Sequence, residues 1–163
     1  MIFMSQSGLT DSSRSDEWAQ WYVEHLRIMR TVDGIDSAER FICDAAGWPP
    51  SLAMYTIRSA AVFDDPYYQK IRGMGSWLPL IDRRYYRRNL FDGAGQAPLV
   101  PPGSVLLVTD RDTISSGIPD VAWTWLKSVG LDRSTPYRGI AVATQEAART
   151  IPPSGEFAVY RRS

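Results

Sequence analysis

The chain has 163 residues, and its 18 basic and 18 acidic side chains give a formal net charge of zero at pH 7. A hydrophobic fraction of 44% and an aromatic fraction of 12% exclude a disordered chain and indicate one globular domain. Cys43 is the only cysteine, which excludes a disulfide within the chain and a cysteine-based zinc site, so we expect a cytoplasmic protein. The sequence contains no apolar run of the length that a membrane-spanning helix needs.

The first part of the chain predicts mainly helices. Residues 1–13 are polar and rich in serine, and we expect them to form a mobile tail. From residue 15 to 32, apolar side chains recur at spacings of three and four residues, which predicts a helix. A second helix is predicted over 36–47, because its first residues resemble a capping box. The composition of 51–63 is compatible with either a helix or a strand.

The middle of the chain predicts two further helices and a loop. Asp64 or Asp65 is a suitable cap for a short helix that begins at Pro66. Ser76 is a suitable cap for another helix that runs through Leu90, with Pro79 in its first turn. The glycines and prolines that follow, in "DGAGQAPLVPPG", predict a loop.

The last third of the chain has the pattern of strands. Continuous apolar runs predict strands over 104–109 and 139–143, and alternation predicts a third over 156–161. A helix is predicted over 119–129. The sequence therefore predicts an α+β fold, with a helical N-terminal half followed by a small mixed β-sheet carrying one or two packed helices. In this scheme 14–163 is a single domain, with a helical part (14–92) and a sheet part (99–163).

Charge is unevenly distributed along the chain. Residues 1–65 carry ten acidic and five basic side chains, a balance of −5, and residues 66–88 carry six basic side chains against one acid, a balance of +5. The stretch "DRRYYRRNLF" places four of those basic groups around two tyrosines. Arginine stacks on aromatic rings and binds anions through paired hydrogen bonds. The segment therefore predicts a contact surface for an anionic partner, with the neutralisation of the acidic N-terminal half as the alternative.

Motifs for catalysis or for metal binding are weak. His25 lies on the apolar face of the first predicted helix, where we expect a packed core histidine, and Cys43 is interpreted as a buried thiol. The chain has no clustered carboxylates at the spacing of metal ligands. We therefore predict no catalytic residues, no metal and no cofactor.

Two segments resemble known motifs. "ICDAAGWPPSLAMYTI", within 37–59, resembles the helix-turn-helix of bacterial repressors, and the resemblance implies that Ser51, Tyr55 and Arg58 face DNA. "YRGIAVATQEAARTIPPSGEFAVYRR" resembles the closing strands of ADP-ribosyltransferases.

The second resemblance implies roles for individual residues. "TISSG" would stand for that family's Ser-Thr-Ser element, Arg58 for its early arginine and Glu146 for its first acid. The second acid falls on Ala148, which implies an inactive relative unless Glu146 or Glu156 takes that role.

The predicted function is that of a non-catalytic, cytoplasmic binding or regulatory protein, of the accessory kind found in phages and mobile elements. The excess of arginine over lysine is typical of GC-rich coding and supports a bacterial source. The expected partner is nucleic acid or an acidic protein face, without a membrane, and a homo-oligomer is left open. The predicted contact residues are basic or aromatic: Tyr67, Tyr68, Lys70, Arg72, Arg83, Arg84, Tyr85, Tyr86, Arg87 and Arg88. The alternatives are an ADP-ribosyltransferase-like protein and a helix-turn-helix regulator.

Overall fold

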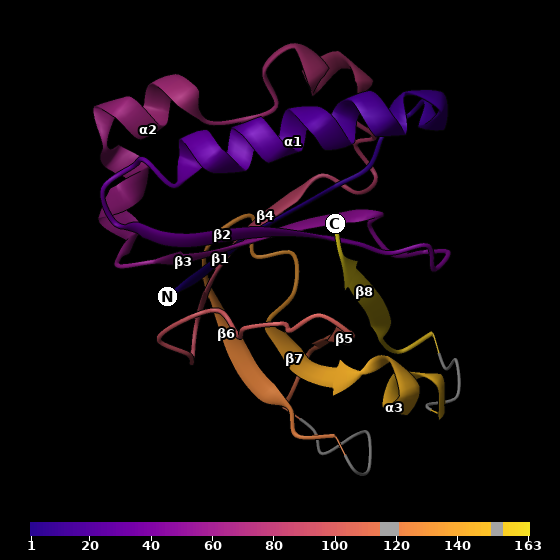
Figure 1. The fold of residues 1–163 in the computed structure, drawn as a ribbon. Coiled ribbons are helices and arrows are strands. Elements are labelled where there is room, and N and C mark those ends of the chain that lie inside the picture. The colour runs from indigo at the N-terminus through magenta and orange to yellow at the C-terminus, as the bar shows by residue number, and fades with distance from the viewer. Residues whose placement is uncertain (115–120, 151–154) are drawn as a thin grey trace.

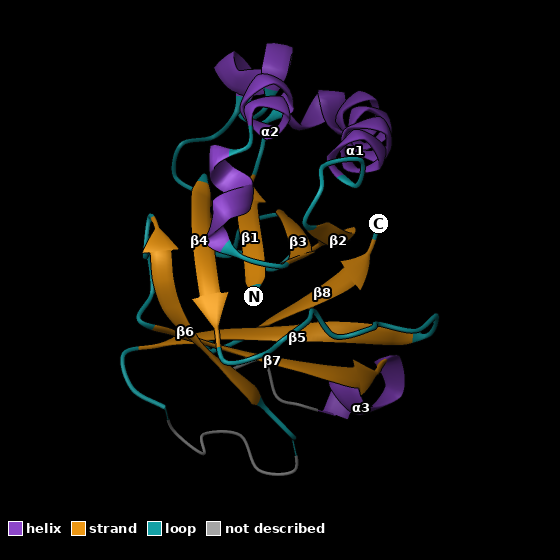
Figure 2. Cartoon of the chain, turned by 90° about the vertical axis from the view of Figure 1, so that its left-hand side faces the viewer, coloured by secondary structure: helices purple, strands orange, loops and turns teal. Residues whose placement is uncertain are grey.

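The structure, a computed structural model, describes residues 1–114, 121–150 and 155–163. Antiparallel strands close into one barrel in the order β1-β3-β2-β8-β5-β7-β6-β4 (Figures 1 and 2). The strands are β1 Ile2–Ser7, β2 Ile35–Ile42, β3 Ser51–Ile57, β4 Arg87–Asp92, β5 Ser104–Arg111, β6 Thr124–Leu131, β7 Tyr137–Thr144 and β8 Ala158–Arg162. The helices are α1 Ser15–Met29, α2 Pro66–Ile71 and α3 Gln145–Thr150, with 3-10 turns η1 Ser12–Arg14, η2 Ala60–Asp64 and η3 Gly75–Leu80.

The predicted α+β fold with a helical N-terminal half, 14–92, is wrong. Three strands of that half, β2, β3 and β4, form one side of the barrel together with β1, which lies inside the predicted mobile tail and has all six of its residues buried. The predicted helix over 36–47 is largely β2, and the one from 76 to 90 is η3 followed by the start of β4. In the sheet part, 99–163, β6 replaces most of the helix predicted over 119–129.

The error at β1 arises because this strand is covered on both faces, whereas β2, β4 and β6 each include exposed residues. Ile2 and Met4 point into the barrel, whereas Phe3 packs outward beneath the helices. A strand that is buried on both faces lacks the alternation of apolar and polar residues by which a strand is recognised. β1 therefore resembles neither an amphipathic helix nor a surface strand.

Several predicted elements are confirmed. α1 and α2 occur where helical spacing and the Pro66 signal place them. The three predicted C-terminal strands share one sheet, because β5 pairs with both β7 and β8. Among the helices that the structure describes, none combines the length and the apolar character needed to cross a membrane.

The barrel consists of two halves with the same strand order. The first half runs β4-β1-β3-β2 and the second β8-β5-β7-β6, so each strand of the first half corresponds to the strand four places later in the chain. The first half has the β-α-β-β-α-β succession of ferredoxin-like domains, with α1 and α2 in the two crossovers. The sequence shows no repeat that would predict this arrangement.

Apolar side chains form three clusters, one inside the barrel and two on its outer face. One cluster fills the barrel interior, including Phe41, Leu52 and Leu106. A second cluster lies between the outer face of β1, β3 and β4 and the layer formed by α1, α2 and η3 (Figure 2). A third, smaller cluster lies on the outer face of β5 and β7.

Candidate functional site

A small cavity lies between the outer face of the first half-barrel and the helices above it. We call this cavity the chamber. Its volume is about 30 Å³, enough for one or two water-sized groups. The strands contribute Phe3, Ser5, Tyr55 and Arg88, and the helical layer with its connections contributes Tyr22, His25, Met29, Tyr68, Arg72, Gly73, Met74 and Tyr86.

Seven polar side chains that line the chamber have no hydrogen-bond or ion-pair partner among the residues that the structure describes: Ser5, His25, Tyr55, Tyr68, Arg72, Tyr86 and Arg88. Ser5, Tyr55 and Tyr68 are buried, His25, Tyr86 and Arg88 are half-buried, and Arg72 is exposed. Polar groups in protein interiors are nearly always paired with protein atoms or with ordered water. Unpartnered groups that surround one cavity are therefore the groups that a bound molecule or water would satisfy.

Local structure brings these side chains together. In β1 and β4, Ser5 lies opposite Arg88, so both side chains leave the same outer face of the sheet. Asp65 accepts a hydrogen bond from the backbone N–H of Tyr68 at 2.8 Å and so caps α2, which holds the Tyr68 ring over the cavity. Gly73, in the left-handed region at a φ of 91°, turns the chain back toward α1 after Arg72.

The chamber is electropositive. None of the described residues that line it is acidic, and two are arginines. Burial lowers the pKa of His25 from 6.5 to about 4, so its imidazole is neutral at pH 7. Burial also raises the pKa of Tyr55 and Tyr68, which keeps both phenols neutral. The chamber thus combines two positive charges with neutral donors and acceptors.

One tyrosine of the chamber has a structural role. The hydroxyl groups of Tyr22 and Ser7 lie 3.2 Å apart, and Tyr22 also donates to the sulfur of Met74 at 3.8 Å. Trp21 stacks on the His25 ring, with centroids 4.5 Å apart. These contacts fix the orientation of α1 over the sheet and hold His25 at the wall of the chamber.

The predicted contact segment is divided between surfaces. Arg88 faces the chamber, whereas Arg87, one position earlier on β4, donates to the backbone oxygens of Arg83 and Tyr86 at 3.1 and 2.8 Å. Successive side chains of a strand point to opposite faces, so neighbouring arginines separate. Arg83 is exposed and does not line the chamber.

Four further predicted residues, Tyr67, Lys70, Arg84 and Tyr85, also lie outside the chamber. Arg84 forms an ion pair with Asp82 at 2.6 Å and stacks over Tyr85. Tyr67 is 45% exposed and its hydroxyl group lies 3.1 Å from that of Thr31, while Lys70 is exposed. Of the ten predicted residues, the structure gathers four around one cavity: Tyr68, Arg72, Tyr86 and Arg88.

Sequence reasoning missed the contributions of β1 and α1. Ser5 and Phe3 were assigned to a mobile tail, and His25 to an ordinary core position. One signal in the sequence could have identified His25. It lies on the same helical face as Tyr22 and Met29, and an ionisable residue on the apolar face of a helix points toward the surface that this face covers.

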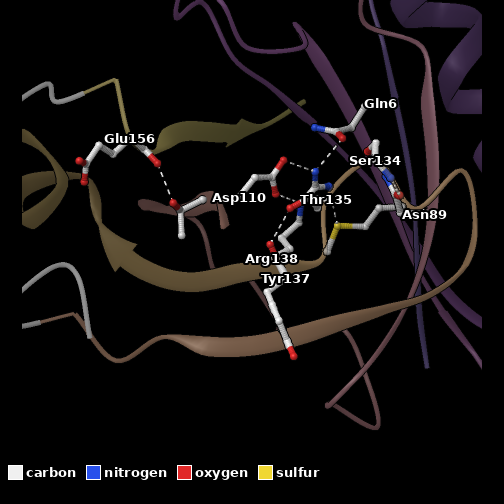
Figure 3. Close-up of polar contacts among 10 residues, drawn as sticks. Gln6, Asn89, Asp110, Ser134, Thr135, Tyr137, Arg138 and Glu156 are labelled. Carbon is white, nitrogen blue, oxygen red and sulfur yellow. Dashed lines mark hydrogen bonds and ion pairs between the residues drawn. The ribbon is translucent and has the colours of Figure 1, made fainter. Parts of the chain in front are cut away.

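A second polar cluster lies inside the barrel (Figure 3). The side chain of Arg138 is fully buried, and its Nε and Nη2 donate to the two carboxylate oxygens of Asp110 at 2.7 and 2.8 Å. Nη2 also donates to Gln6 at 2.9 Å, and Nη1 lies 3.5 Å from the sulfur of Met4. The guanidinium lies 5.2 Å from the centre of the Phe91 ring.

Further hydrogen bonds extend this interior cluster. Asn89 exchanges two hydrogen bonds with Ser134, both 2.8 Å long, and Thr135 donates to the backbone oxygen of Tyr137 at 2.8 Å. On the outer face of β5, where Val105 and Leu107 also point, Thr109 donates to the backbone oxygen of Glu156 at 2.6 Å (Figure 3). Because Arg138 is already paired, this cluster joins β1, β5 and β7 and is a structural feature of the barrel.

The structure contradicts the helix-turn-helix resemblance but does not test the resemblance to ADP-ribosyltransferases. Residues 37–59, which are all described, contain β2 and β3 and no helix, and Tyr55 is only 2% exposed, so the helix-turn-helix interpretation is wrong. For the ADP-ribosyltransferase resemblance, Ser115 lies outside the described residues. Arg58 pairs with Asp33 and Asp36 in the first half, whereas Glu146 and Ala148 lie on α3 and Glu156 precedes β8. That resemblance stays a prediction.

No protein-family model, curated protein or solved structure matches the chain. The protein is therefore characterised by its fold alone: a closed barrel of two similar half-barrels, with the chamber and its two arginines on the helical side. Among the described residues, no group of three or more His, Cys, Asp or Glu side chains is arranged to hold a metal ion.

Proposed function

We propose that the protein is a binding protein that takes the charged head of a small organic acid into the chamber. The observation that carries this proposal is the set of seven unpartnered polar side chains around a cavity that has two arginines and no acid in its lining. Guanidinium groups pair with carboxylates and phosphates in preference to neutral groups. The predicted preference for anions is retained, with a small ligand in place of a macromolecule.

The size of the chamber supports a carboxylate as the buried group. A cavity of about 30 Å³ accommodates one or two water-sized groups, which is the size of two carboxylate oxygens. Arg88 and Arg72 would neutralise the charge, and Tyr68 and Tyr86 would donate hydrogen bonds. The neutral imidazole of His25 is available as a donor or an acceptor. The remainder of the ligand would lie at the mouth of the chamber.

The finer predictions about partners and location are also proposals. The only cysteine, Cys43, is buried and free. Proteins of oxidising compartments commonly carry disulfides, so a single free thiol supports a cytoplasmic location. Binding of nucleic acid or of an acidic protein would fall to the exposed residues Arg83, Arg84 and Lys70 rather than to the chamber.

A thermal-shift titration tests the proposal. Acetate, benzoate and inorganic phosphate are added to the wild type, to Arg88→Gln and to Arg83→Gln, with chloride at equal ionic strength as reference. A ligand at ten times its Kd stabilises the folded state by about 1.4 kcal/mol, which raises Tm by roughly 3–6 °C in a chain of this size.

The variants distinguish specific binding from a general salt effect. We expect a carboxylate to stabilise the wild type and Arg83→Gln equally, and to leave Arg88→Gln unchanged. Equal responses in all three proteins would show that the chamber is not the site, and the proposal would be rejected.

A further inference from the structure

A groove on the opposite side of α1 from the chamber carries four arginines. Its volume is about 250 Å³, close to the lower end of the range for small-molecule sites. Its lining includes Arg27 on α1, Arg30 at the C-terminal cap of α1, Arg40 on β2 and Arg162 on β8. Arg27 forms an ion pair with Glu24 at 2.6 Å, and Glu39 is the single acidic side chain among the described residues that line the groove. We call this feature the arginine groove. It shares only Tyr22 with the chamber.

Arg40 is a buried cation without a counterion. Its residue is 7% exposed, and its Nε donates to Ser51 at 2.9 Å. Its guanidinium lies against the rings of Trp18 and Tyr22, with its carbon 4.8 and 4.4 Å from their centres. Within the described part of the chain, no carboxylate forms an ion pair with Arg40, and its Nη1 is buried without a hydrogen-bond partner.

The burial of the Arg40 guanidinium is energetically unfavourable in the absence of a bound acceptor. A guanidinium stays protonated in proteins, so Arg40 cannot escape the penalty of burial by losing its proton. A buried charge that is left unpaired destabilises the folded state. Burial accordingly lowers the pKa of Arg40, because it disfavours the charged form. The two aromatic faces offset only part of this penalty.

A second donor in the same cluster also lacks an acceptor. The indole Nε1 of Trp18, whose ring contacts the Arg40 guanidinium, is buried without a partner. Glu39 forms no hydrogen bond with either donor: its Oε1 accepts from Arg162 at 3.0 Å, and its Oε2 is itself buried without a partner. Two buried donors thus lack acceptors, one on Arg40, which lines the groove, and one on Trp18, which packs against Arg40. A bound group with more than one acceptor oxygen would satisfy both.

From this geometry we infer that the arginine groove is a second binding site, specific for a small molecule that carries a carboxylate or a phosphate on a short apolar body. The oxyanion pairs with Arg40 at the base of the groove, and Arg30 adds charge at the rim. The apolar body lies on Ala19, Val23 and Leu26, of which Val23 is 71% exposed in the free protein. The inference does not depend on the chamber, because the anion-binding residues of the two sites differ.

The test follows the Trp18 indole N–H by ¹⁵N NMR, with its signal assigned through Trp18→Phe. Hexanoate and hexyl phosphate are the probes, so that the two possible head groups are compared on one apolar body. We expect a saturable shift with at least one probe below about 10 mM, ten times the Kd of a weak millimolar complex. If neither probe shifts the signal, the inference is overturned.

Two variants locate the site. Arg40→Met removes the buried charge and keeps the volume, so we expect Tm to stay or rise while the Kd for the probe increases at least about tenfold. Unchanged probe affinity in Arg40→Met would overturn the inference. Val23→Glu adds a negative charge at the exposed rim and should weaken binding up to about fivefold without an effect on folding.

A matched control accompanies Val23→Glu. Gln20→Glu adds the same charge to an exposed position of α1 that does not line the groove, and we expect an unchanged Kd. Equal weakening by Gln20→Glu and Val23→Glu would show a general charge effect and would contradict a site in the groove. Arg88→Gln should bind both probes in the groove as the wild type does, which separates this site from the chamber.

Discussion

Replacing Asp110 by asparagine should reveal how strongly the barrel depends on its buried ion pair. Arg138 has a fully buried side chain, and Asp110, 34% exposed, supplies two of its acceptor oxygens. Asn keeps the shape but has one acceptor oxygen and no charge, so the guanidinium would be left buried and only partly paired. Such a change typically costs 3–5 kcal/mol, and the partial exposure of Asp110 favours the lower end, about 3 kcal/mol.

Urea unfolding, followed by tryptophan fluorescence and circular dichroism, measures this effect. For a slope of about 2 kcal/mol per molar urea, the midpoint should fall by about 1.5 M. The double variant Arg138→Met with Asp110→Asn should be more stable than Asp110→Asn alone, because no buried charge is left unpaired. If Asp110→Asn lies within about 0.5 kcal/mol of the wild type, or if the double variant is the less stable of the two, the ion pair does not have this role.

Three further outcomes follow from the structure. Burial lowers the pKa of His25 from 6.5 to about 4. The imidazole is therefore protonated below pH 6.5 in the unfolded chain but only below about pH 4 in the folded chain. The free energy of unfolding should therefore fall by at most about 3 kcal/mol as the pH is lowered through that window, and urea midpoints of His25→Gln should lack this component. Gly93→Ala should destabilise more than Gly47→Ala in the same assay: both glycines have positive φ, but only at Gly93 would a Cβ meet a backbone oxygen, that of Trp125, at 2.7 Å. If the exposed arginines bind nucleic acid, Arg83→Ala with Arg84→Ala should weaken that binding and flatten its salt dependence in a filter-binding assay, without a change in Tm.

Local signals in the sequence were sufficient for some elements of the fold. The helical spacing of residues 15–29, the Pro66 start of α2 and the apolar runs of β5 and β7 each identify an element without tertiary information. The strands of the first half could not be identified in this way. β1 and β3 are buried on both faces, by the barrel interior and by the helices, so neither shows the alternation of a surface strand.

The chamber was predictable only in part. The local positive charge pointed to Arg72 and Arg88, but the sequence does not indicate that β4 turns Arg87 away from Arg88. The sequence likewise does not indicate that His25 and Ser5, 20 positions apart, line one cavity. These relationships arise from strand pairing and from the packing of α1, which are long-range contacts.

The most direct test of the chamber is a pH titration of the single histidine, His25, by NMR, with and without a carboxylate probe. In the free protein the imidazole should titrate at about pH 4. A carboxylate bound beside it stabilises the imidazolium form, so saturating acetate or benzoate should raise the pKa of His25 in the wild type and leave it unchanged in Arg88→Gln. A pKa of His25 that does not respond to either acid in the wild type would contradict the proposal that the chamber binds the head of an organic acid.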